Sequence, residues 1–312
     1  PPGFRKKDTI STVTFKQNAF EMLPDNCVRL KLPKTYTRRE IMLKYQLPPD
    51  TALGRVQQVK LLHETRTGIW YLHIIHKVEV KYREFGNIMS LDLGIVNIMA
   101  GVITNGYSFT VPGGELLALD RYFQKEKSKC TKSTSRRCVE LNIKWGRQRR
   151  HYLHTLTKWL VELAVANDVS TIVVGELKGI RQDKNWGKAG NQKLHAWPFS
   201  KVEELLTYKA ALAGISVIKV SEKNTSTTCP VCGKRTKKAR RHRGLFVHCS
   251  KALNADLVGA YNILQRYLRE TGLTKSDWSG VVGVLARPAV NLFVWRKATS
   301  KGRGQGTFKQ AA

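Results

Sequence analysis

The pattern of hydrophobic and polar positions divides the chain into a β-rich first part and a mixed second part. Up to residue 85 the apolar positions form short runs, TVTF, VRLKL, QQVKLLHE and IWYLHIIHKVEV, which Pro, Gly, Asp and Asn separate. In the last run Trp70, Leu72 and Ile74 recur at every second position, which is the period of a strand with one packed face. Residues 1–85 are therefore predicted to form a β-rich domain.

From residue 86 the pattern changes to strands that alternate with helices. The stretch NIMSLDLGIVNIMAGVITNGYSFTVPGG has the Gly, Asn-Gly and Pro-Gly breaks of a strand meander. Leucines from Leu153 to Leu163 lie on one face of a helix within the segment 115–167. STIVVGE, KVEELLTYKAALAG, ISVIKVS and DLVGAYNILQRYLRE follow as strand, helix, strand and helix. This alternation predicts an α/β sheet.

Two segments interrupt or follow this α/β region. Residues 226–254 carry cysteines at metal-ligand spacing, so the α/β domain is expected over residues 86–225 and 255–295 on either side of them. The last segment, 296–312 with the sequence RKATSKGRGQGTFKQAA, is rich in Gly and Lys. It is predicted to be a basic, disordered tail.

The charge of the chain indicates a polyanionic partner. There are 54 Lys and Arg against 23 Asp and Glu, a formal net charge of +31. Such a surface binds phosphate backbones largely by counterion release, so a nucleic acid is expected. A ribosomal-type protein and a membrane-surface protein are the alternatives. No run approaches the roughly 18 apolar residues of a membrane span, and PPGFRKKDTI lacks a signal-peptide core, so an intracellular protein is expected.

Basic side chains are concentrated in the helical segment. Between residues 121 and 160 there are twelve Lys or Arg and only two acidic residues, Glu126 and Glu140. A solvated helix face is one interpretation, and binding of a nucleic-acid backbone is the one we favour. A second basic run lies between the cysteines. The candidate nucleic-acid contacts in the two runs are Arg136, Arg137, Lys144, Arg147, Arg149, Arg150, Lys237, Lys238, Arg240 and Arg241.

Three carboxylates stand at the edges of apolar elements. Asp92 lies in the strand SLDLGIVN, Glu176 ends the strand TIVVGE, and Asp256 begins the helix NADLVGAYNIL. A carboxylate inside an apolar strand is costly to bury unless it is paired or binds a metal. The carboxyl ends of strands are also where α/β sheets place their chemistry. Taken singly each residue is unspecific, since Asp256 alone is equally a favourable acid at a helix N-terminus.

Together the three carboxylates suit metal-assisted hydrolysis of phosphodiesters. That reaction uses several carboxylates to hold two Mg²⁺ ions about 3.5–4 Å apart, one activating water and the other stabilising the leaving oxygen. Hard oxygen ligands favour Mg²⁺ or Mn²⁺ over zinc. We therefore predict a catalytic metal centre at Asp92, Glu176 and Asp256.

A structural zinc site is predicted at the cysteines. Cys229 and Cys232 have knuckle spacing and Cys249 follows a basic loop, whereas a tetrahedral zinc site needs four ligands. His248 and His242 are the fourth candidates, and a ligand from outside the segment or none at all are the alternatives. Neighbours in an extended strand point to opposite sides, so His248 and Cys249 are an awkward pair. A segment that has lost its metal, and a redox C-x-x-C, are the other interpretations.

The motifs together resemble the transposon-encoded TnpB (OrfB) family and, more distantly, the type V CRISPR effector nucleases. SLDLGIVNIMA resembles the first RuvC motif of the family, VVGELKGIR the second and NADLVGAYNIL the third. TSTTCPVCG is similar to its zinc knuckle, and the likeness runs from about residue 10 to 268. It implies an α/β RNase H-like (RuvC) nuclease domain with an inserted zinc ribbon, preceded by a wedge-type partial β-barrel.

The resemblance also implies an activity and partners. Members act with a guide RNA on a target DNA, so the implied function is RNA-guided DNA cleavage with Mg²⁺ or Mn²⁺ at Asp92, Glu176 and Asp256. The implied setting is a prokaryote or the host of a virus or mobile element, with no small-molecule substrate. Zinc would be held by Cys229 and Cys232 together with Cys249.

Two departures from the family pattern qualify this picture. Phe246 stands where the first cysteine of a second C-x-x-C is expected. The recognition portion that precedes PPGFRKKDTISTVTF in the family is expected to be absent, which affects guided targeting more than the catalytic centre. Two other functions therefore remain as alternatives, a nucleic-acid-binding protein without guided cleavage and a transposase or transposase accessory protein.

Overall fold

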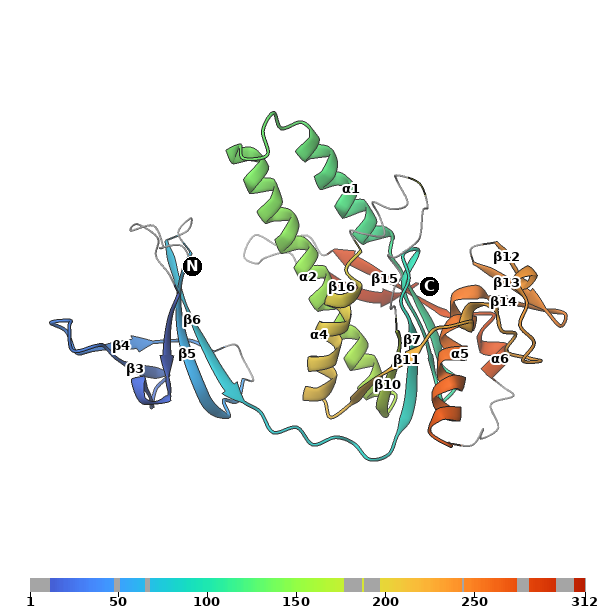
Figure 1. The fold of residues 1–312 in the computed structure, drawn as a ribbon, viewed down its shortest axis with the longest axis horizontal. Helices are drawn as coiled ribbons and strands as arrows, with labels where there is room; N and C mark the ends of the chain where they lie inside the picture. Colours follow the sequence, from blue (N-terminus) through green and yellow to red (C-terminus); the bar gives the residue numbers. More distant parts are fainter. Residues whose placement is uncertain are drawn as a thin grey trace, which may run out of the picture. The chain divides into compact units, whose positions relative to one another are not determined.

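The computed structural model describes most of the chain as two compact units. They comprise Pro1–Glu79 and Val80–Ala312, a division a few residues before the predicted boundary at residue 85 (Figure 1). The structure describes residues 12–47, 51–64, 68–176, 187, 197–242, 244–273, 281–295 and 306–311.

The first unit consists of two antiparallel three-stranded sheets. Their strand orders are β1-β5-β6 and β2-β3-β4, and one short 3-10 helix, Gln17–Ala19, follows β1. A small core of Phe15, Phe20, Val28 and Val59 is buried among these strands. The described part of this unit is thus β-rich, as the alternation predicts. The strands are β1 Val13–Lys16, β2 Phe20–Leu23, β3 Cys27–Lys31, β4 Glu40–Lys44, β5 Arg55–Glu64 and β6 Ile69–Lys77.

The second unit is built on a mixed seven-stranded sheet of order β11-β10-β7-β8-β9-β15-β16. The three strands β7, β8 and β9 form an antiparallel meander, while β10 and β11 run parallel to β7. The carboxyl ends of β7, β10 and β11 therefore meet at one edge. The strands are β7 Asn87–Asp92, β8 Asn97–Ile103, β9 Ser108–Pro112, β10 Val169–Glu176, β11 Ser216–Ser221, β15 Ala289–Trp295 and β16 Gly306–Gln310.

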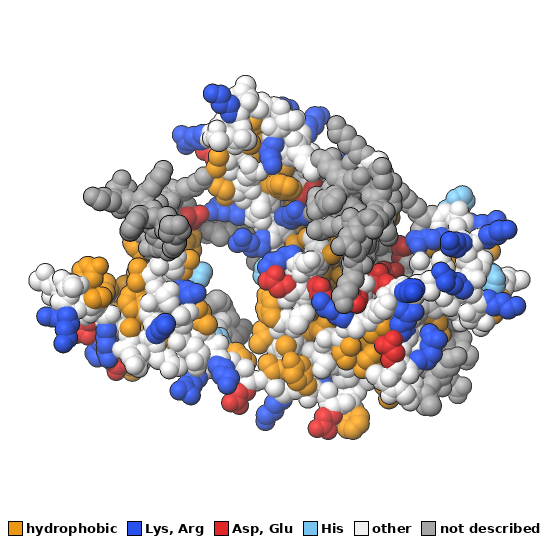
Figure 2. Space-filling view, viewed as in Figure 1, with side chains coloured by type: hydrophobic (Ala, Val, Ile, Leu, Met, Phe, Trp, Pro, Cys, Tyr) orange, Lys and Arg blue, Asp and Glu red, His pale blue; other side chains and the backbone are white. Residues whose placement is uncertain are grey.

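Helices cover both faces of this sheet. On one face α2 and α4 pack over the main core, and α5 packs on the other face against β7 and β8 (Figure 1). The predicted helical segment 115–167 is a pair of helices, α1 and α2, whose outer end extends beyond the sheet. Figure 2 shows Lys and Arg side chains at that outer end. The helices are α1 Gly114–Ser128, α2 Arg136–Ala166, α4 Phe199–Leu212, α5 Ala255–Glu270 and α6 Val281–Val284.

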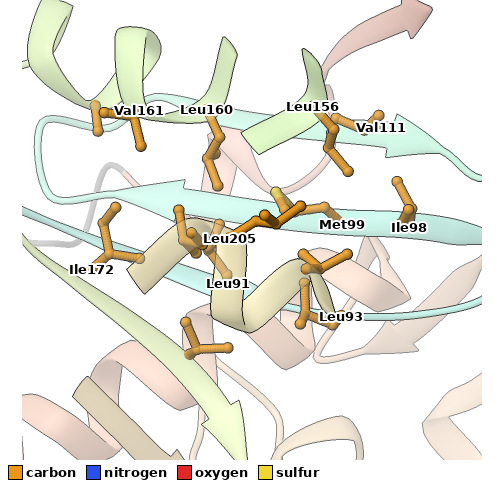
Figure 3. Packing of buried hydrophobic residues seen from close by; sticks show 14 of the residues in the cluster. Leu91, Leu93, Ile98, Met99, Val111, Leu156, Leu160, Val161, Ile172 and Leu205 are labelled. Carbon is orange, nitrogen blue, oxygen red and sulfur yellow. The ribbon is translucent and has the colours of Figure 1, made fainter. Parts of the chain in front are cut away.

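The main core forms because apolar residues recur at helical spacing in α2 and at strand spacing in the meander. Leu156 and Leu160 of α2 are fully buried and point toward Met99 of β8 and Leu91 of β7 (Figure 3). Burying a leucine side chain contributes on the order of 2 kcal/mol, so this layer fixes the strands whose ends carry the site.

A polar contact joins α1 to α2. The Asp120 carboxylate is buried and accepts a hydrogen bond of 2.7 Å from Nε1 of Trp145, while Arg149 lies 3.7 Å from it. The Lys127 ammonium stands 4.9 Å from the centre of the Trp145 ring. Burial raises the pKa of Asp120, and the hydrogen bond from Trp145 opposes that rise.

The cysteine-bearing segment forms its own small antiparallel sheet of order β12-β13-β14. Phe246 is fully buried in the core that this segment shares with α5. Its elements are the 3-10 helices η2 Thr225–Thr227 and η3 Lys237–Ala239 and the strands β12 Arg240–His242, β13 Leu245–His248 and β14 Lys251–Asn254.

The prediction of a wholly disordered tail over residues 296–312 is wrong. Gly306–Gln310 is strand β16, which pairs antiparallel with β15. Phe308 is buried there, with its ring 5.1 Å from Phe293 and 5.8 Å from Tyr152. Phe308 thus anchors the end of this Gly- and Lys-rich segment in the main core. Residues 296–305 lie outside the described part of the chain.

Candidate functional site

Asp92 ends β7 at the edge where the parallel strands finish. It pairs with Ala100 of β8 and is half-buried, whereas Leu91 and Leu93 on either side are buried. Helix α5 passes so close that a Cβ added to Gly259 would lie 2.1 Å from Oδ2 of Asp92. The glycine therefore allows the helix to pack against this carboxylate.

Asp256 is brought to Asp92 by the first turn of α5. The side chain of Asn254 caps the helix, accepting from the backbone N–H groups of Asp256 at 3.0 Å and Leu257 at 3.2 Å. Nδ2 of Asn97 donates to Oδ2 of Asp256 at 2.8 Å, and Arg240 donates to Oδ1 at 3.1 Å. Both carboxylate oxygens are thus oriented by side-chain donors.

The electrostatics of this edge favour a bound cation. Burial raises the pKa of Asp92 well above its ordinary value, and the carboxylates of Glu222 and Asp256 raise it further. Arg240 acts in the opposite direction. Like charges held together in this way are stabilised by a divalent cation, and their oxygen atoms are the ligands that Mg²⁺ and Mn²⁺ prefer. The donor set therefore fits the predicted metal.

Glu176 lies at the same edge, as the last residue of β10. It stands opposite Ser221 of β11 in the parallel pair. The charges that act on the carboxyl of Asp92 include those of Glu222, Asp256 and Arg240. The structure thus brings Asp92 and Asp256 together, and the role of Glu176 stays a prediction.

Two further polar residues of this edge, Glu222 and Asn97, were not predicted from the sequence. Glu222 follows β11 directly, and Asn97 opens β8. The position of Glu222 just after the strand ISVIKVS was the available signal, since the carboxyl end of a parallel strand is a functional position.

A second cluster lies in the cysteine-bearing segment. The ligand atoms of Cys229, Cys232, His248 and Cys249 all lie within 4.8 Å of one another and could hold a metal ion. Nδ1 of His248 is 3.0 Å from Sγ of Cys249 and 3.6 Å from Sγ of Cys232. Three thiols and one imidazole are a donor set that suits tetrahedral zinc.

The expectation that His248 and Cys249 are an awkward pair of ligands is wrong, because both lie in the cluster. Cys249 and Ser250 both have positive φ, 49° and 56°, and they form the two-residue turn between β13 and β14. The strand therefore ends at His248, and the turn redirects the next side chain to the same side. His242, the other candidate, ends β12 outside this cluster. Phe246, at the position of the expected cysteine, fills the core instead.

The predicted nucleic-acid contacts fall into two groups. In α2 the side chain of Arg136 is 94% exposed beside Glu140, whereas that of Arg149 is 20% exposed and faces Asp120 and Trp145. Around β12–β14 the side chains of Lys237, Lys238 and Arg241 are exposed, and Lys and Arg gather there (Figure 2). Among the candidates, Arg240 is directed to Asp256.

Two family models match the chain. The model described as a probable transposase, OrfB_IS605, matches residues 73–181, and that of the Cas12f1-like TNB domain matches residues 199–263. The first match contains Asp92 and Glu176, and the second contains the cysteine cluster and Asp256. No helix in the described part of the chain has the length and apolar character needed to cross a membrane.

Curated relatives align with about two thirds of the chain. The TnpB-like protein MJ0751 of Methanocaldococcus jannaschii is 27% identical over 202 residues, covering 61% of this chain and 72% of that protein. The CRISPR-associated endodeoxyribonuclease Cas12f1 of Sulfoacidibacillus thermotolerans is 24% identical over 229 residues, covering 67% of this chain and 53% of the relative. The chain thus spans about half the length of this Cas12f1.

The fold is also similar to that of a solved Cas12f1. The cryo-EM structure of a Cas12f1–sgRNA–target DNA complex superposes with a TM-score of 0.52 at 18% identity. The match covers 67% of this chain and 45% of the Cas12f1 chain. At this identity the likeness concerns the fold, a mixed sheet flanked by helices.

Proposed function

Since the chain belongs to the family of TnpB-like (OrfB) proteins, related to the Cas12f endodeoxyribonucleases, we propose that it is a metal-dependent DNA endonuclease guided by RNA. The observation that carries the proposal is the pair of Asp92 and Asp256 at the carboxyl edge of the sheet. They come from elements far apart in the sequence, and Gly259 makes room for their approach.

The catalytic chemistry follows from these carboxylates. Asp92 and Asp256 would hold Mg²⁺ or Mn²⁺ together with a third carboxylate from the same edge. Glu176 is the residue that the sequence predicts for this third position, and Glu222 lies at the same edge. The metal, when bound, activates water and stabilises the leaving oxygen of a phosphodiester. Asn97 and the cap at Asn254 orient Asp256 for this role. Arg240 would stabilise negative charge close to the scissile phosphate.

Nucleic acid would be held by the basic side chains of α2 and of the β12–β14 segment. Guide RNA and target DNA are the proposed partners, because the solved Cas12f1 is a complex with both and the chain is strongly basic. The β12–β14 segment would act as a zinc ribbon, with zinc at Cys229, Cys232, His248 and Cys249. Arg240 belongs to this segment and donates to Asp256, so folding of the segment would affect catalysis.

The proposal is tested with the purified protein and the RNA that co-purifies with it. Sequencing this RNA defines a matched DNA, and cleavage is then followed in Mg²⁺ and in EDTA. We expect a Mg²⁺-dependent product that Asp92→Ala abolishes. Salt-dependent RNA binding without any such product would favour the nucleic-acid-binding alternative. Equal cutting by the Asp92→Ala variant would refute the assignment of the centre.

A further inference from the structure

Two glutamates reach the edge where Asp92 lies. Glu176 ends β10, and Glu222 directly follows β11, the next parallel strand. Because the carboxyl ends of these strands lie side by side, the backbone positions alone allow either residue to serve the site. The direction of each side chain decides which of them faces Asp92.

The alternation along β10 separates its two faces. Val173 packs in the small cluster on the α5 side, whereas Val174 belongs to the main core under α2 and α4. Successive side chains of a strand point to opposite faces, so Gly175 continues the face of Val173 and Glu176 that of Val174. The carboxylate of Asp92 lies on the α5 face, against Gly259. Position 175, and not 176, therefore faces the site.

Glu222 occupies the space in front of Gly175. A Cβ added to Gly175 would lie 2.0 Å from Oε1 and 2.6 Å from Cδ of Glu222. Glycine is thus required there to accommodate the glutamate from the neighbouring strand. After burial, Glu222 is the strongest influence that raises the pKa of Asp92, ahead of Asp256. The carboxylate of Glu222 consequently lies in the electrostatic field of the other two.

The backbone around Glu222 is held in place from α5 and from its own turn. Arg266 donates to the carbonyl of Ser221 and, at 2.7 Å, to that of Lys223, the two residues that flank Glu222. The carbonyl of Glu222 itself accepts from Oγ1 of Thr225 at 2.9 Å. Carboxylates fixed close together repel one another, and a shared cation relieves this repulsion.

We propose that Glu222, in place of Glu176, is the third carboxylate of the metal centre with Asp92 and Asp256. Position 175 of β10 faces the site but is a glycine, so the carboxylate comes instead from Glu222, directly after the neighbouring strand β11. This inference rests on the proposed function, because it concerns the ligands of the metal that function requires.

The test compares Glu222→Gln with Glu176→Gln in the full chain. Metal binding is measured as the rise in Tm when Mn²⁺ is added to the metal-free protein, and cleavage of the matched DNA is measured in single turnover. We expect Glu222→Gln to lose most of the Mn²⁺-dependent rise in Tm and at least about 100-fold in cleavage rate. Glu176→Gln is expected to keep both within about 3-fold of the wild type.

A rescue experiment guards against simple misfolding. In the Glu222→Ala background, Gly175→Asp places a carboxylate in the space that Glu222 has left, so Mn²⁺ binding and part of the cleavage should return. Loss of Mn²⁺ binding in Glu176→Gln with none in Glu222→Gln would overturn the inference and leave the proposed function standing. Unchanged Mn²⁺ binding and cleavage in Asp92→Asn would instead refute the proposed function itself.

Discussion

Gly259 and Asp92 are packed so closely that a Cβ on the glycine would come within 2.1 Å of the Asp92 carboxylate. The contact lets the first turns of α5 lie against the end of β7, and it is why Asp256 reaches the same edge. The geometry of the centre thus depends on the absence of one methyl group.

Substituting Gly259 by alanine tests this dependence. We expect Gly259→Ala to displace Asp92 and to reduce cleavage by at least about 100-fold, because small displacements at a catalytic centre have effects of that size. Gly146→Ala in α2 is the matched control, since nothing lies within 4 Å of its added Cβ. This control should be stabilised by roughly 0.5–1 kcal/mol and remain active. Equal cleavage by both variants would contradict the account.

Removing the charge of Asp92 should stabilise the metal-free protein. Burial and the neighbouring carboxylates hold the pKa of Asp92 above its unfolded value, so the folded state binds its proton more tightly. The free energy of unfolding should therefore fall as the pH rises from the pKa of Asp92 in the unfolded state to its pKa in the folded state. At neutral pH the metal-free Asp92→Asn variant should have the higher Tm, and its advantage should shrink as the pH is lowered.

The control for this measurement is Glu140→Gln on the exposed surface of α2. Its Tm should stay close to that of the wild type at every pH, because exposed ion pairs contribute about 0–1 kcal/mol. A Tm of Asp92→Asn below that of the wild type at neutral pH, in EDTA, would contradict this account. It would show that the charged Asp92 side chain stabilises the metal-free protein.

The fourth zinc ligand is tested by metal analysis. The purified protein should contain about one zinc ion per chain, and His248→Ala should lose most of it because a structural site needs four ligands. His242→Ala should retain the metal, since His242 lies outside the cluster. The opposite pattern, with zinc lost in His242→Ala only, would exclude the cluster described above.

Binding through α2 is tested by the salt dependence of affinity. Lys144→Glu and Arg150→Glu should weaken binding of RNA or DNA of any sequence, and the salt slope should fall by about 1 for each phosphate that the variant no longer neutralises. Lys158→Glu is the control, because Lys158 lies further along α2 with its side chain 73% exposed beside Glu162. Equal effects of all three variants would indicate non-specific electrostatic attraction and would contradict a defined binding surface on α2.

The periodic elements could be predicted from the sequence because burial on one face leaves a regular pattern. The leucines of α2 mark its packed face, and Asp92 stands out because Leu91 and Leu93 beside it are buried. Asn254 is the helix cap that the polar residues before α5 indicate. These features depend on residues close together in the chain.

Other features depend on contacts that the sequence does not display. The choice between Glu176 and Glu222 depends on a single step of strand alternation, which reverses the side-chain direction. The convergence of His248 and Cys249 depends on positive φ angles in a turn without glycine or asparagine. The strand β16 depends on Phe308 meeting Phe293 across the sheet. Each of these three features is visible only once the position of a neighbouring strand or turn is known.

The most direct test of a single catalytic centre is the single-turnover rate of DNA cleavage in Mg²⁺ by Asp92→Asn, Asp256→Asn and the double variant. Residues that act as one unit have effects that do not multiply. We predict that each single variant loses at least about 1000-fold and that the double variant is no slower than either. Cleavage near the wild-type rate by either single variant would contradict the account, as would a loss in the double variant equal to the product of the two.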